Sequence, residues 1–164
     1  MSTRYQLIVI GSGAAGMMAA ITASRDGKSV LLLEKLSKIG AKLKATGGGR
    51  CNLTNTLPNE EFMRRFGRDG RFMSPALELL DHKALMSFFE QIGVQSHAPD
   101  GYRVFPITHS SSTIINAMEQ EMDNLGVEVK CASKVETLSH DGVKVTGVET
   151  QDDIYYADAV VVAS

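Results

Sequence analysis

The sequence Gly-Ser-Gly-Ala-Ala-Gly at positions 11–16 constrains the fold of this chain more than any other feature. A short apolar run rich in β-branched residues, Tyr5–Ile10, precedes it, and an Ala- and Met-rich segment, Gly13–Asp26, follows it. This order predicts a buried strand, a tight turn and a helix packed closely on a sheet. A second apolar run, Ser29–Glu34, predicts a parallel strand that the helix joins to the first. We therefore expect a right-handed βαβ unit.

The glycines match G-x-G-x-x-G, the phosphate-binding fingerprint of dinucleotide-binding βαβ units. Gly11 permits the tight turn, Gly13 lets a pyrophosphate approach the backbone, and Gly16 allows close contact between helix and sheet. The N–H groups at the helix N-terminus would bind the phosphates. Glu34 ends the second strand at the distance expected for the acidic residue that accepts hydrogen bonds from ribose hydroxyls. These features predict a site for an ADP-containing cofactor and leave NAD and FAD as alternatives.

Further helices are predicted by apolar periodicity and by capping residues. They are expected over Glu60–Phe66, Ser74–Leu80, His82–Ile92 and from the Ser110–Thr113 cluster to Leu125. The segment Lys35–Thr56 is rich in Gly, Lys and Asn with little periodicity, and it is too long for a passive connection in a compact domain. We therefore expect this glycine-rich loop to contact a ligand.

The C-terminal part of the chain is predicted to be mainly strands. These are a third parallel strand at Val127–Cys131, a meander of Lys134–Ser139, Val143–Glu149 and Asp153–Tyr156, and a last parallel strand at Ala157–Ala163. The fold class expected is α/β, a Rossmann-like FAD-binding domain formed by a βαβ unit plus a three-stranded β-meander, with a helical insertion.

The predicted organisation is one discontinuous sheet domain that carries an insertion. Residues 1–56 would form the βαβ core and the glycine-rich loop, residues 57–108 the helical insertion, and residues 109–164 the helix, the meander and the last parallel strand. Because Ser164 follows directly on an apolar strand, we expect a truncated chain.

Composition and charge argue against several classes of function. The 164 residues are 43% hydrophobic and 22% charged, as in ordinary globular domains. A formal net charge of −2 argues against nucleic acid as a partner. The apolar runs are far shorter than the roughly 20 residues that cross a bilayer, and no signal-peptide pattern is present. We expect a cytoplasmic protein with no membrane partner.

The cysteines and histidines indicate neither a disulfide scaffold nor a metal centre. Cys51 and Cys131 lie far apart without a CxxC spacing, so reduced thiols are expected. Arg50 is a neighbouring cation that could lower the pKa of Cys51. The four histidines lack metal-ligand spacing, and no metal site is expected.

Two motifs and the meander resemble those of a known family. A meander before the last parallel strand is the crossover of FAD-binding members of the two-dinucleotide-binding-domain superfamily. Residues 40–55 resemble the G-x-K-…-[ST]-G-G-G-R-C-N-x-T-N signature of the YhiN-type (BaiN-like) family of NAD(P)/FAD-dependent oxidoreductases. Arg103–Pro106 resembles the family's G-R-V-F-P element, with Tyr102 in place of the usual glycine. The resemblance covers essentially the whole chain.

The resemblance implies a noncovalent FAD cofactor and a set of contacts to it. The pyrophosphate turn would be Gly11, Ser12, Gly13, Ala15 and Gly16, and the adenosine end would meet Glu34 and Lys35. Thr46, Gly47 and Gly48 would lie along the pyrophosphate and ribityl chain, Asn52 nearer the flavin, and Val135 would offer its backbone to the adenine. Lys42 and Arg50 are the cations placed to meet the flavin or its phosphates.

The function implied is an FAD-dependent oxidoreductase that exchanges a hydride between flavin and a small organic substrate, with NAD(P)H as a candidate electron donor. This chain alone is expected to be inactive. An NAD-dependent dehydrogenase domain and a non-catalytic, truncated FAD-binding domain are the alternatives. The residues predict no catalytic side chain and no oligomeric state.

Overall fold

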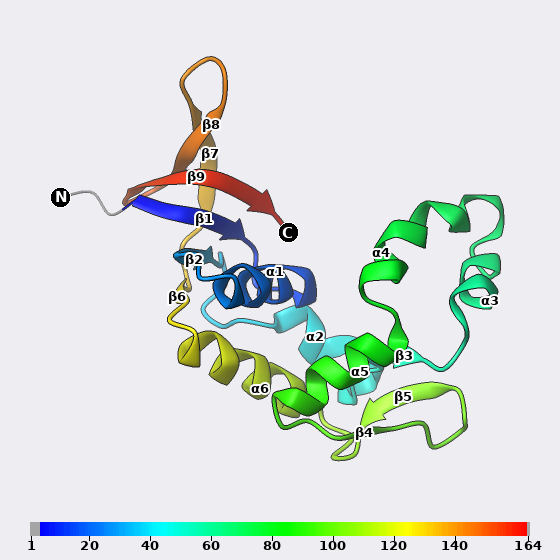
Figure 1. Cartoon of the computed structure of the whole chain (residues 1–164). Helices are drawn as coiled ribbons and strands as arrows, with labels where there is room; N and C mark the ends of the chain where they lie inside the picture. Colours follow the sequence, from blue (N-terminus) through cyan, green and yellow to red (C-terminus); the bar gives the residue numbers. More distant parts are fainter. Residues whose placement is uncertain (1–3, 164) are drawn as a thin grey trace. The chain divides into compact units, whose positions relative to one another are not determined.

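A computed structural model describes residues 4–163, which divide into two compact units (Figure 1). Within the described residues, the first unit consists of residues 4–43 together with residues 118–163, and the second of Lys44–Ala117. The glycine-rich loop from Thr46 onward thus belongs to the same unit as the helices of residues 57–108. The expectation that the chain is truncated rests on Ser164, which lies outside the described residues.

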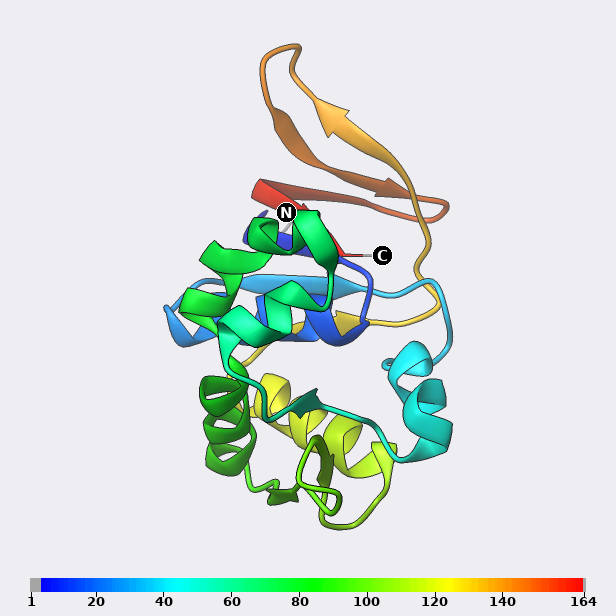
Figure 2. The same ribbon diagram turned by 90° about the vertical axis from the view of Figure 1, so that its right-hand side faces the viewer.

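The first unit is built on a six-stranded mixed sheet in the order β6-β2-β1-β9-β8-β7. The strands are β1 (Arg4–Ile10), β2 (Val30–Leu33), β6 (Glu128–Lys130), β7 (Val135–His140), β8 (Val145–Thr150) and β9 (Ile154–Val162). β1 pairs in parallel with β2 and β9, and β2 pairs in parallel with β6. β7, β8 and β9, drawn in orange to red in Figure 2, are antiparallel neighbours. The Rossmann-like α/β fold with a three-stranded meander is confirmed.

The crossover helix α1 (Ala14–Arg25) lies between β1 and β2 in sequence and buries one face. Its buried residues Gly16, Met17, Ala20, Ile21 and Ser24 recur at helical spacing, so they form a single stripe. β2 is buried at all four positions, as expected for a parallel strand covered on both faces. The short apolar run at 30–33 therefore forms a central strand.

The end of the meander differs from the sequence prediction. Asp153–Tyr156 and Ala157–Ala163 were expected as two strands, but both predictions were wrong because the residues form one strand, β9. β9 pairs antiparallel with β8 through Ile154–Tyr156 and in parallel with β1 from Tyr156 to Val162. No glycine, proline or other turn-forming residue separates Tyr156 from Ala157, so nothing interrupts the extended backbone.

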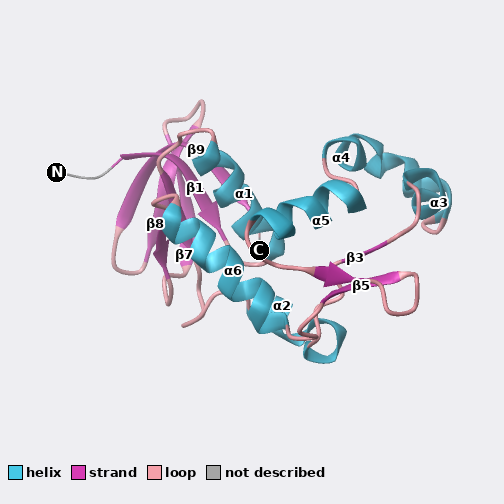
Figure 3. Ribbon diagram, turned by 60° about the horizontal axis from the view of Figure 1, so that its bottom comes forward, coloured by secondary structure: helices cyan, strands magenta, loops and turns pink. Residues whose placement is uncertain are grey.

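The second unit combines short helices with a three-stranded antiparallel sheet in the order β3-β5-β4. Figure 3 shows α3, α4 and α5 together with the strands β3 and β5. The strands are β3 (Thr54–Asn55), β4 (Ser96–His97) and β5 (Arg103–Pro106). The helices are η1 (Thr46–Gly49), α3 (Asn59–Arg64), η2 (Gly67–Met73), α4 (Ser74–Leu79) and α5 (His82–Gln91). Two further helices cross the boundary between the units in sequence, α2 (Ala41–Ala45) and α6 (Ser111–Asn124).

The helix α5 and the strand β5 both contribute apolar side chains to the core of the second unit. Phe88 and Phe89 on α5, with Val104 and Phe105 on β5, are buried. Asp81 caps α5 by accepting a hydrogen bond from the backbone N–H of Ala84 at 2.8 Å. The amphipathic helix predicted over His82–Ile92 is therefore present, one residue shorter.

No helix within residues 4–163 has both the length and the apolar content that crossing a membrane would require.

Candidate functional site

The glycine turn connects β1 to α1 and leaves the first amides of the helix without a side-chain cap. Gly13 is the N-cap residue, with an extended backbone (φ −70°, ψ −178°) and no side-chain hydrogen bond to the helix. The helix begins with the bond from the Met17 N–H to the Gly13 carbonyl at 3.0 Å. Uncapped N–H groups together with the positive end of the helix dipole form an arrangement that binds anions.

Gly13 and Gly16 meet different surroundings. A Cβ atom at Gly16 would collide with the carbonyl oxygen of Gly11 and would lie 3.4 Å from the Cβ of Ala163. A Cβ atom at Gly13 would have no other atom within 4 Å. Gly16 is therefore required for packing inside the protein, whereas Gly13 faces open space that a pyrophosphate can approach. The turn fits the phosphates of a dinucleotide.

The carboxylate of Glu34 is buried at the end of β2 and holds the glycine turn. Its Oε2 accepts hydrogen bonds from the Ser12 N–H at 2.9 Å and the Ser12 Oγ at 2.5 Å. Its Oε1 accepts from the backbone N–H of Leu36 at 2.9 Å. An ionised carboxylate has about four acceptor positions, so about one remains, on Oε1, for a ribose hydroxyl.

The pKa of Glu34 is lowered in spite of its burial. Burial raises the pKa because it disfavours the charged form, but the hydrogen bonds from the Ser12 hydroxyl and from the backbone of Leu36 and Ser12 outweigh it. The positive charge of Lys35 adds to the lowering. Glu34 is thus an ionised, acceptor-only carboxylate at neutral pH, a state well suited to hydrogen bonds from hydroxyl groups.

The other predicted contacts of the first unit lie at its surface or in its core. Ala15 is exposed in the first turn of α1, Lys35 is exposed directly after Glu34, and Lys42 is exposed on α2. Val135 opens β7, pairs with Thr150 and packs half-buried against the core cluster that contains Tyr5 and Ile8. The Val135 side chain is therefore used in packing, and a contact of its backbone with adenine stays a prediction.

The glycine-rich loop of the second unit is a left-handed turn. Gly47, Gly48 and Gly49 have φ values of 58°, 65° and 86°, a region that residues with a Cβ atom rarely adopt. The Cys51 N–H closes the turn on the Thr46 carbonyl at 3.2 Å. A Cβ at Gly47 would lie 3.1 Å from the Asn52 nitrogen, so the turn is also tightly packed. The Gly-Gly-Gly sequence is needed for this backbone.

Arg50 and Asn52 hold the loop in place. The Arg50 Nε donates to the Gly47 carbonyl at 3.3 Å, and the guanidinium lies 5.2 Å from the centroid of the Phe105 ring. The side-chain amide of Asn52, oriented with its nitrogen toward the strands, donates hydrogen bonds to the carbonyl oxygens of Val104 at 3.2 Å and Thr54 at 2.9 Å. Both side chains thus connect the loop to β5 or β3, and their predicted contacts with a flavin stay predictions.

Cys51 is buried next to this loop, at 2% exposure. Burial raises the pKa of the Cys51 thiol, and its hydrogen bond with Thr46 compensates only in part. The expectation that Arg50 would lower the Cys51 pKa was therefore wrong, because the guanidinium lies on the Phe105 ring and burial dominates. A buried thiol of this kind is a weak nucleophile.

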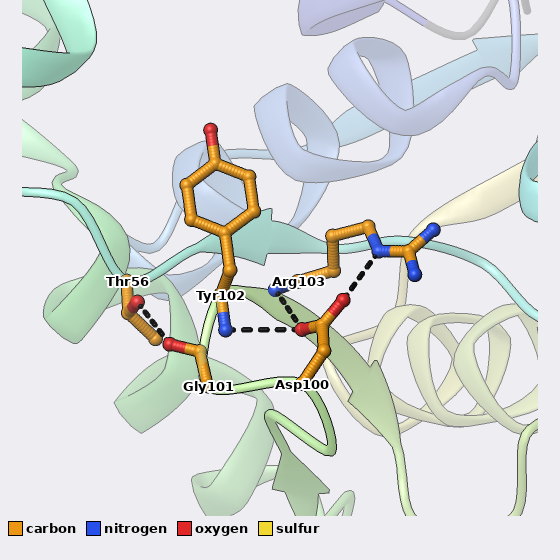
Figure 4. Close-up of polar contacts among 5 residues, drawn as sticks. All are labelled: Thr56, Asp100, Gly101, Tyr102 and Arg103. Carbon is orange, nitrogen blue, oxygen red and sulfur yellow. Dashed lines mark hydrogen bonds and ion pairs between the residues drawn. The ribbon is translucent and has the colours of Figure 1, made fainter.

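Sequence reasoning missed Asp100, which organises the turn before β5 (Figure 4). Its Oδ1 accepts from the N–H groups of Tyr102 at 3.0 Å and Arg103 at 2.7 Å, and its Oδ2 accepts from the Arg103 Nε at 2.7 Å. Across the turn, the Thr56 hydroxyl donates to the Gly101 carbonyl at 2.9 Å. The signal in the sequence is Asp-Gly followed by Tyr-Arg, because Asp favours turns that its side chain can bridge.

Comparison with known proteins agrees with this fold. A family model described as HI0933-like protein Rossmann domain matches residues 5–164. The 3-dehydro-bile acid delta(4,6)-reductase of Clostridium scindens is 33% identical over 132 residues, 79% of this chain and 32% of that protein. A ribosomal RNA dihydrouridine synthase of Haemophilus influenzae is 28% identical over 135 residues, 82% of this chain and 33% of that protein.

Among solved structures, the 3-ketosteroid-delta4-(5alpha)-dehydrogenase of Rhodococcus jostii RHA1 has the same fold. It aligns with a TM-score of 0.72 at 20% identity, over 97% of this chain and 45% of that chain. This chain spans about a third of the length of the two curated relatives.

Proposed function

Because the chain belongs to the HI0933-like family of Rossmann domains, we propose that it binds FAD as part of a flavin-dependent oxidoreductase. The observation that carries this proposal is the open approach to Gly13 beside the buried, ionised Glu34. FAD would supply the hydride chemistry at the flavin, and the residues of this chain would bind and orient it.

Each part of the first unit would have one role in binding the ADP half of FAD. The uncapped N–H groups at the start of α1 would bind the pyrophosphate at Gly13. Glu34 Oε1 would accept a hydrogen bond from a ribose hydroxyl, while its Oε2 keeps Ser12 and the turn in place. The exposed Ala15 would lie along the pyrophosphate, and the exposed Lys35 would lie at the adenosine end.

The resemblance of the glycine-rich loop supports further contacts to FAD from Lys42, Thr46, Gly47, Gly48, Arg50 and Asn52. Arg50 is fixed by its bond to Gly47 and by the Phe105 ring, so its charge is held in one position. A fixed cation near a flavin favours the anionic reduced form. NAD(P)H is the proposed electron donor.

We propose a small organic substrate, in line with the bile acid reductase of Clostridium scindens among the relatives. The net charge of −2 favours this substrate class over a nucleic acid, and the short apolar runs support a protein without a membrane partner. A second candidate is reduction of a base in RNA, which the ribosomal RNA dihydrouridine synthase of Haemophilus influenzae favours. Both candidates place the same cofactor at the same glycine turn.

Titration of the purified chain with FAD, followed by calorimetry, tests cofactor binding. We expect binding of FAD, competition by ADP, and loss of both in Gly13→Val with an unchanged circular dichroism spectrum, because a Cβ atom at Gly13 has no protein atom within 4 Å. A folded wild-type chain that binds NADH but not FAD would establish the nicotinamide alternative. A chain that binds neither would refute the proposal.

Activity is tested separately on the FAD-loaded chain under anaerobic conditions. Loss of the visible flavin absorbance on addition of NADPH or NADH would support an oxidoreductase. No loss is the result expected if this chain alone is inactive, and it does not distinguish an oxidoreductase from a non-catalytic FAD-binding domain. Reoxidation of the reduced flavin by a 3-dehydro bile acid, compared with reoxidation by ribosomal RNA, separates the two substrate classes.

A further inference from the structure

An open cavity lies within the second unit, among the consecutive helices α3, η2 and α4, which Figure 1 shows in shades of green. Its volume is about 640 Å³, within the range of roughly 300–1,000 Å³ that small-molecule sites occupy. Three arginines line it, Arg64, Arg68 and Arg71, and Glu60 is the one acidic residue in its lining within the described part of the chain. A lining so rich in arginine indicates a ligand with negative charge.

The backbone that carries these arginines is closely packed. Gly70 is buried in η2, and a Cβ atom there would collide with the carbonyl oxygen of Met63 on α3. The Phe66 N–H donates to the same carbonyl at 3.0 Å, and the rings of Phe62 and Phe66 meet edge to face with 5.2 Å between their centroids. η2 therefore packs directly against α3, and the three arginine side chains start from fixed positions around the cavity.

The arginines have more hydrogen-bond donors than the neighbouring carboxylates use. Arg64 Nη2 lies 3.8 Å from Glu60 Oε2, and Arg68 Nε lies 3.5 Å from Asp69 Oδ1. The Arg64 and Arg68 side chains are 79% and 93% exposed, and ion pairs this exposed contribute little. Within residues 4–163, the Arg71 side chain has no ion pair or hydrogen bond. Each guanidinium has five N–H donors, so most of them remain available to a ligand.

We propose that this cavity binds a small molecule through a phosphomonoester group, which Arg64, Arg68 and Arg71 hold together. Three guanidiniums and one carboxylate in the lining leave an excess of two positive charges, which a phosphomonoester of about −1.5 to −2 at pH 7 balances. The planar guanidinium also matches the spacing of phosphate oxygens and can bind two of them at once.

A small phosphorylated molecule suits the cavity better than a nucleic acid does. A polyanion is bound by positive charge spread along its length, whereas this chain has a net charge of −2. The proposal does not depend on FAD binding, because the glycine turn belongs to the first unit and the cavity lies in the second.

Glucose 6-phosphate and glucose form a matched pair of probes, since they differ only in the phosphate. Carbon-detected NMR of the guanidinium signals in the intact, isotopically labelled chain locates the binding. We expect glucose 6-phosphate to shift the signals of Arg64, Arg68 and Arg71 together and glucose to shift none of them. Added salt should weaken the binding, because the charges are exposed to solvent.

Arg71→Gln and Arg65→Gln remove the same charge from the same unit. Arg65 follows Arg64 on α3 but does not line the cavity, and its Nη2 lies 3.3 Å from Glu61 Oε1. We expect glucose 6-phosphate to bind Arg71→Gln about 3- to 10-fold more weakly, an effect between those of an exposed ion pair and a charged hydrogen bond. Arg65→Gln should bind it as the wild type does. An equal loss in the two variants would overturn the proposal, because the effect would then come from net charge alone.

NADPH and NADH distinguish two sources of the phosphomonoester, because they differ only in the 2′-phosphate. A stronger effect of NADPH than of NADH on the three arginine signals would support the proposal with a cofactor as the source. Equal effects, together with a response to glucose 6-phosphate, would support it with a phosphorylated metabolite as the source.

Three results in the wild-type chain would overturn the proposal even if a variant fails to fold. These are equal shifts with glucose and glucose 6-phosphate, shifts of other arginines instead of the three in the cavity, and tighter binding of a single-stranded RNA dodecamer than of glucose 6-phosphate. Gly13→Val, which should lose FAD, should still bind glucose 6-phosphate, so failure of the cofactor proposal and failure of this one are distinguishable.

Discussion

Ser12 and Glu34, 22 positions apart, are joined by two hydrogen bonds to the same carboxylate oxygen, from the Ser12 N–H at 2.9 Å and the Ser12 Oγ at 2.5 Å. The acidic residue at the end of β2 therefore has a structural role in addition to its predicted contact with ribose. It ties the turn that follows β1 to the end of the neighbouring strand. Substitutions of Ser12 and of Glu34 should therefore affect the free energy of unfolding and the affinity for FAD to different extents.

Ser12→Ala should lower stability without lowering FAD affinity. It removes the hydroxyl bond to Glu34 and frees an acceptor position on Oε2, which a ribose hydroxyl can use. We expect a loss of about 1–3 kcal/mol in the free energy of unfolding, the usual scale for a hydrogen bond to a charged group. Urea unfolding and FAD titration of the same preparation measure the two effects.

Glu34→Ala should instead lower both quantities. Loss of the acceptor leaves the buried Ser12 hydroxyl unpaired and removes the ribose contact, so FAD affinity should fall by about 1–3 kcal/mol. An unchanged dissociation constant for FAD would remove Glu34 from the site, whatever happens to stability.

Gly13→Ala and Gly16→Ala should separate binding from folding. The new methyl group at position 16 collides with the Gly11 carbonyl, so we expect a loss of about 3 kcal/mol or more in stability. At position 13 the methyl group meets no protein atom, and replacement of an N-cap Gly by Ala should cost about 1 kcal/mol or less. FAD affinity should nevertheless fall in Gly13→Ala. Thermal unfolding with calorimetric titration checks both; equal stability of the two variants would contradict the packing assigned to Gly16.

Acid unfolding should reflect the lowered pKa of Glu34. A group with a lowered pKa in the folded state stabilises the fold above its unfolded pKa, and this stability is lost as the pH falls through the folded value. Below a pH of about 4.3, the ordinary pKa of Glu, the wild type should therefore lose stability more steeply than Glu34→Gln. Urea midpoints measured across this range give the comparison. The exposed Glu90→Gln should follow the wild-type curve.

Asp100 should titrate far below an ordinary aspartate. The hydrogen bonds from the Arg103 side chain and from the backbone of Arg103 and Tyr102 lower the pKa of Asp100 to about 2. Arg103→Met removes the first of these causes, so the pKa should rise toward about 3.9. Carboxyl-detected NMR titration measures it. A value of about 2 in the variant would assign the shift to the backbone bonds alone.

Cys131 should react with iodoacetamide faster than Cys51. Burial raises the pKa of both thiols, but Cys51 is 2% exposed whereas Cys131 is partly exposed. Peptide mass mapping over a time course at neutral pH gives both rates. Faster labelling of Cys51 would show that its loop opens in solution.

Local patterns predicted most of the elements in the first unit. The apolar runs at 5–10 and 29–34 and the glycines between them specify β1, the turn, α1 and β2, because each feature has one compatible backbone. The division of residues 153–163 into two strands was wrong, since strand pairing on both sides of β9 is a tertiary property. The hydrogen bond from the Leu36 N–H to Glu34, and the hydrogen bonds made by the Arg50 and Asn52 side chains, also depend on the folded backbone. The periodicity of the sequence does not predict them.

The register of β9 also determines when this fold can assemble. Arg4 at the start of β1 is paired with Tyr156, so one neighbour of the first strand is synthesised 152 positions later along the chain. Contacts so distant in sequence slow folding, because a long loop must close before they form. During translation, the edge of β1 that pairs with β9 therefore stays unpaired until β9 has been synthesised. By contrast, residues 44–117 are contiguous in sequence and include every segment of the second unit. A ribosome-bound chain should expose that edge to chaperones until residue 162 has emerged.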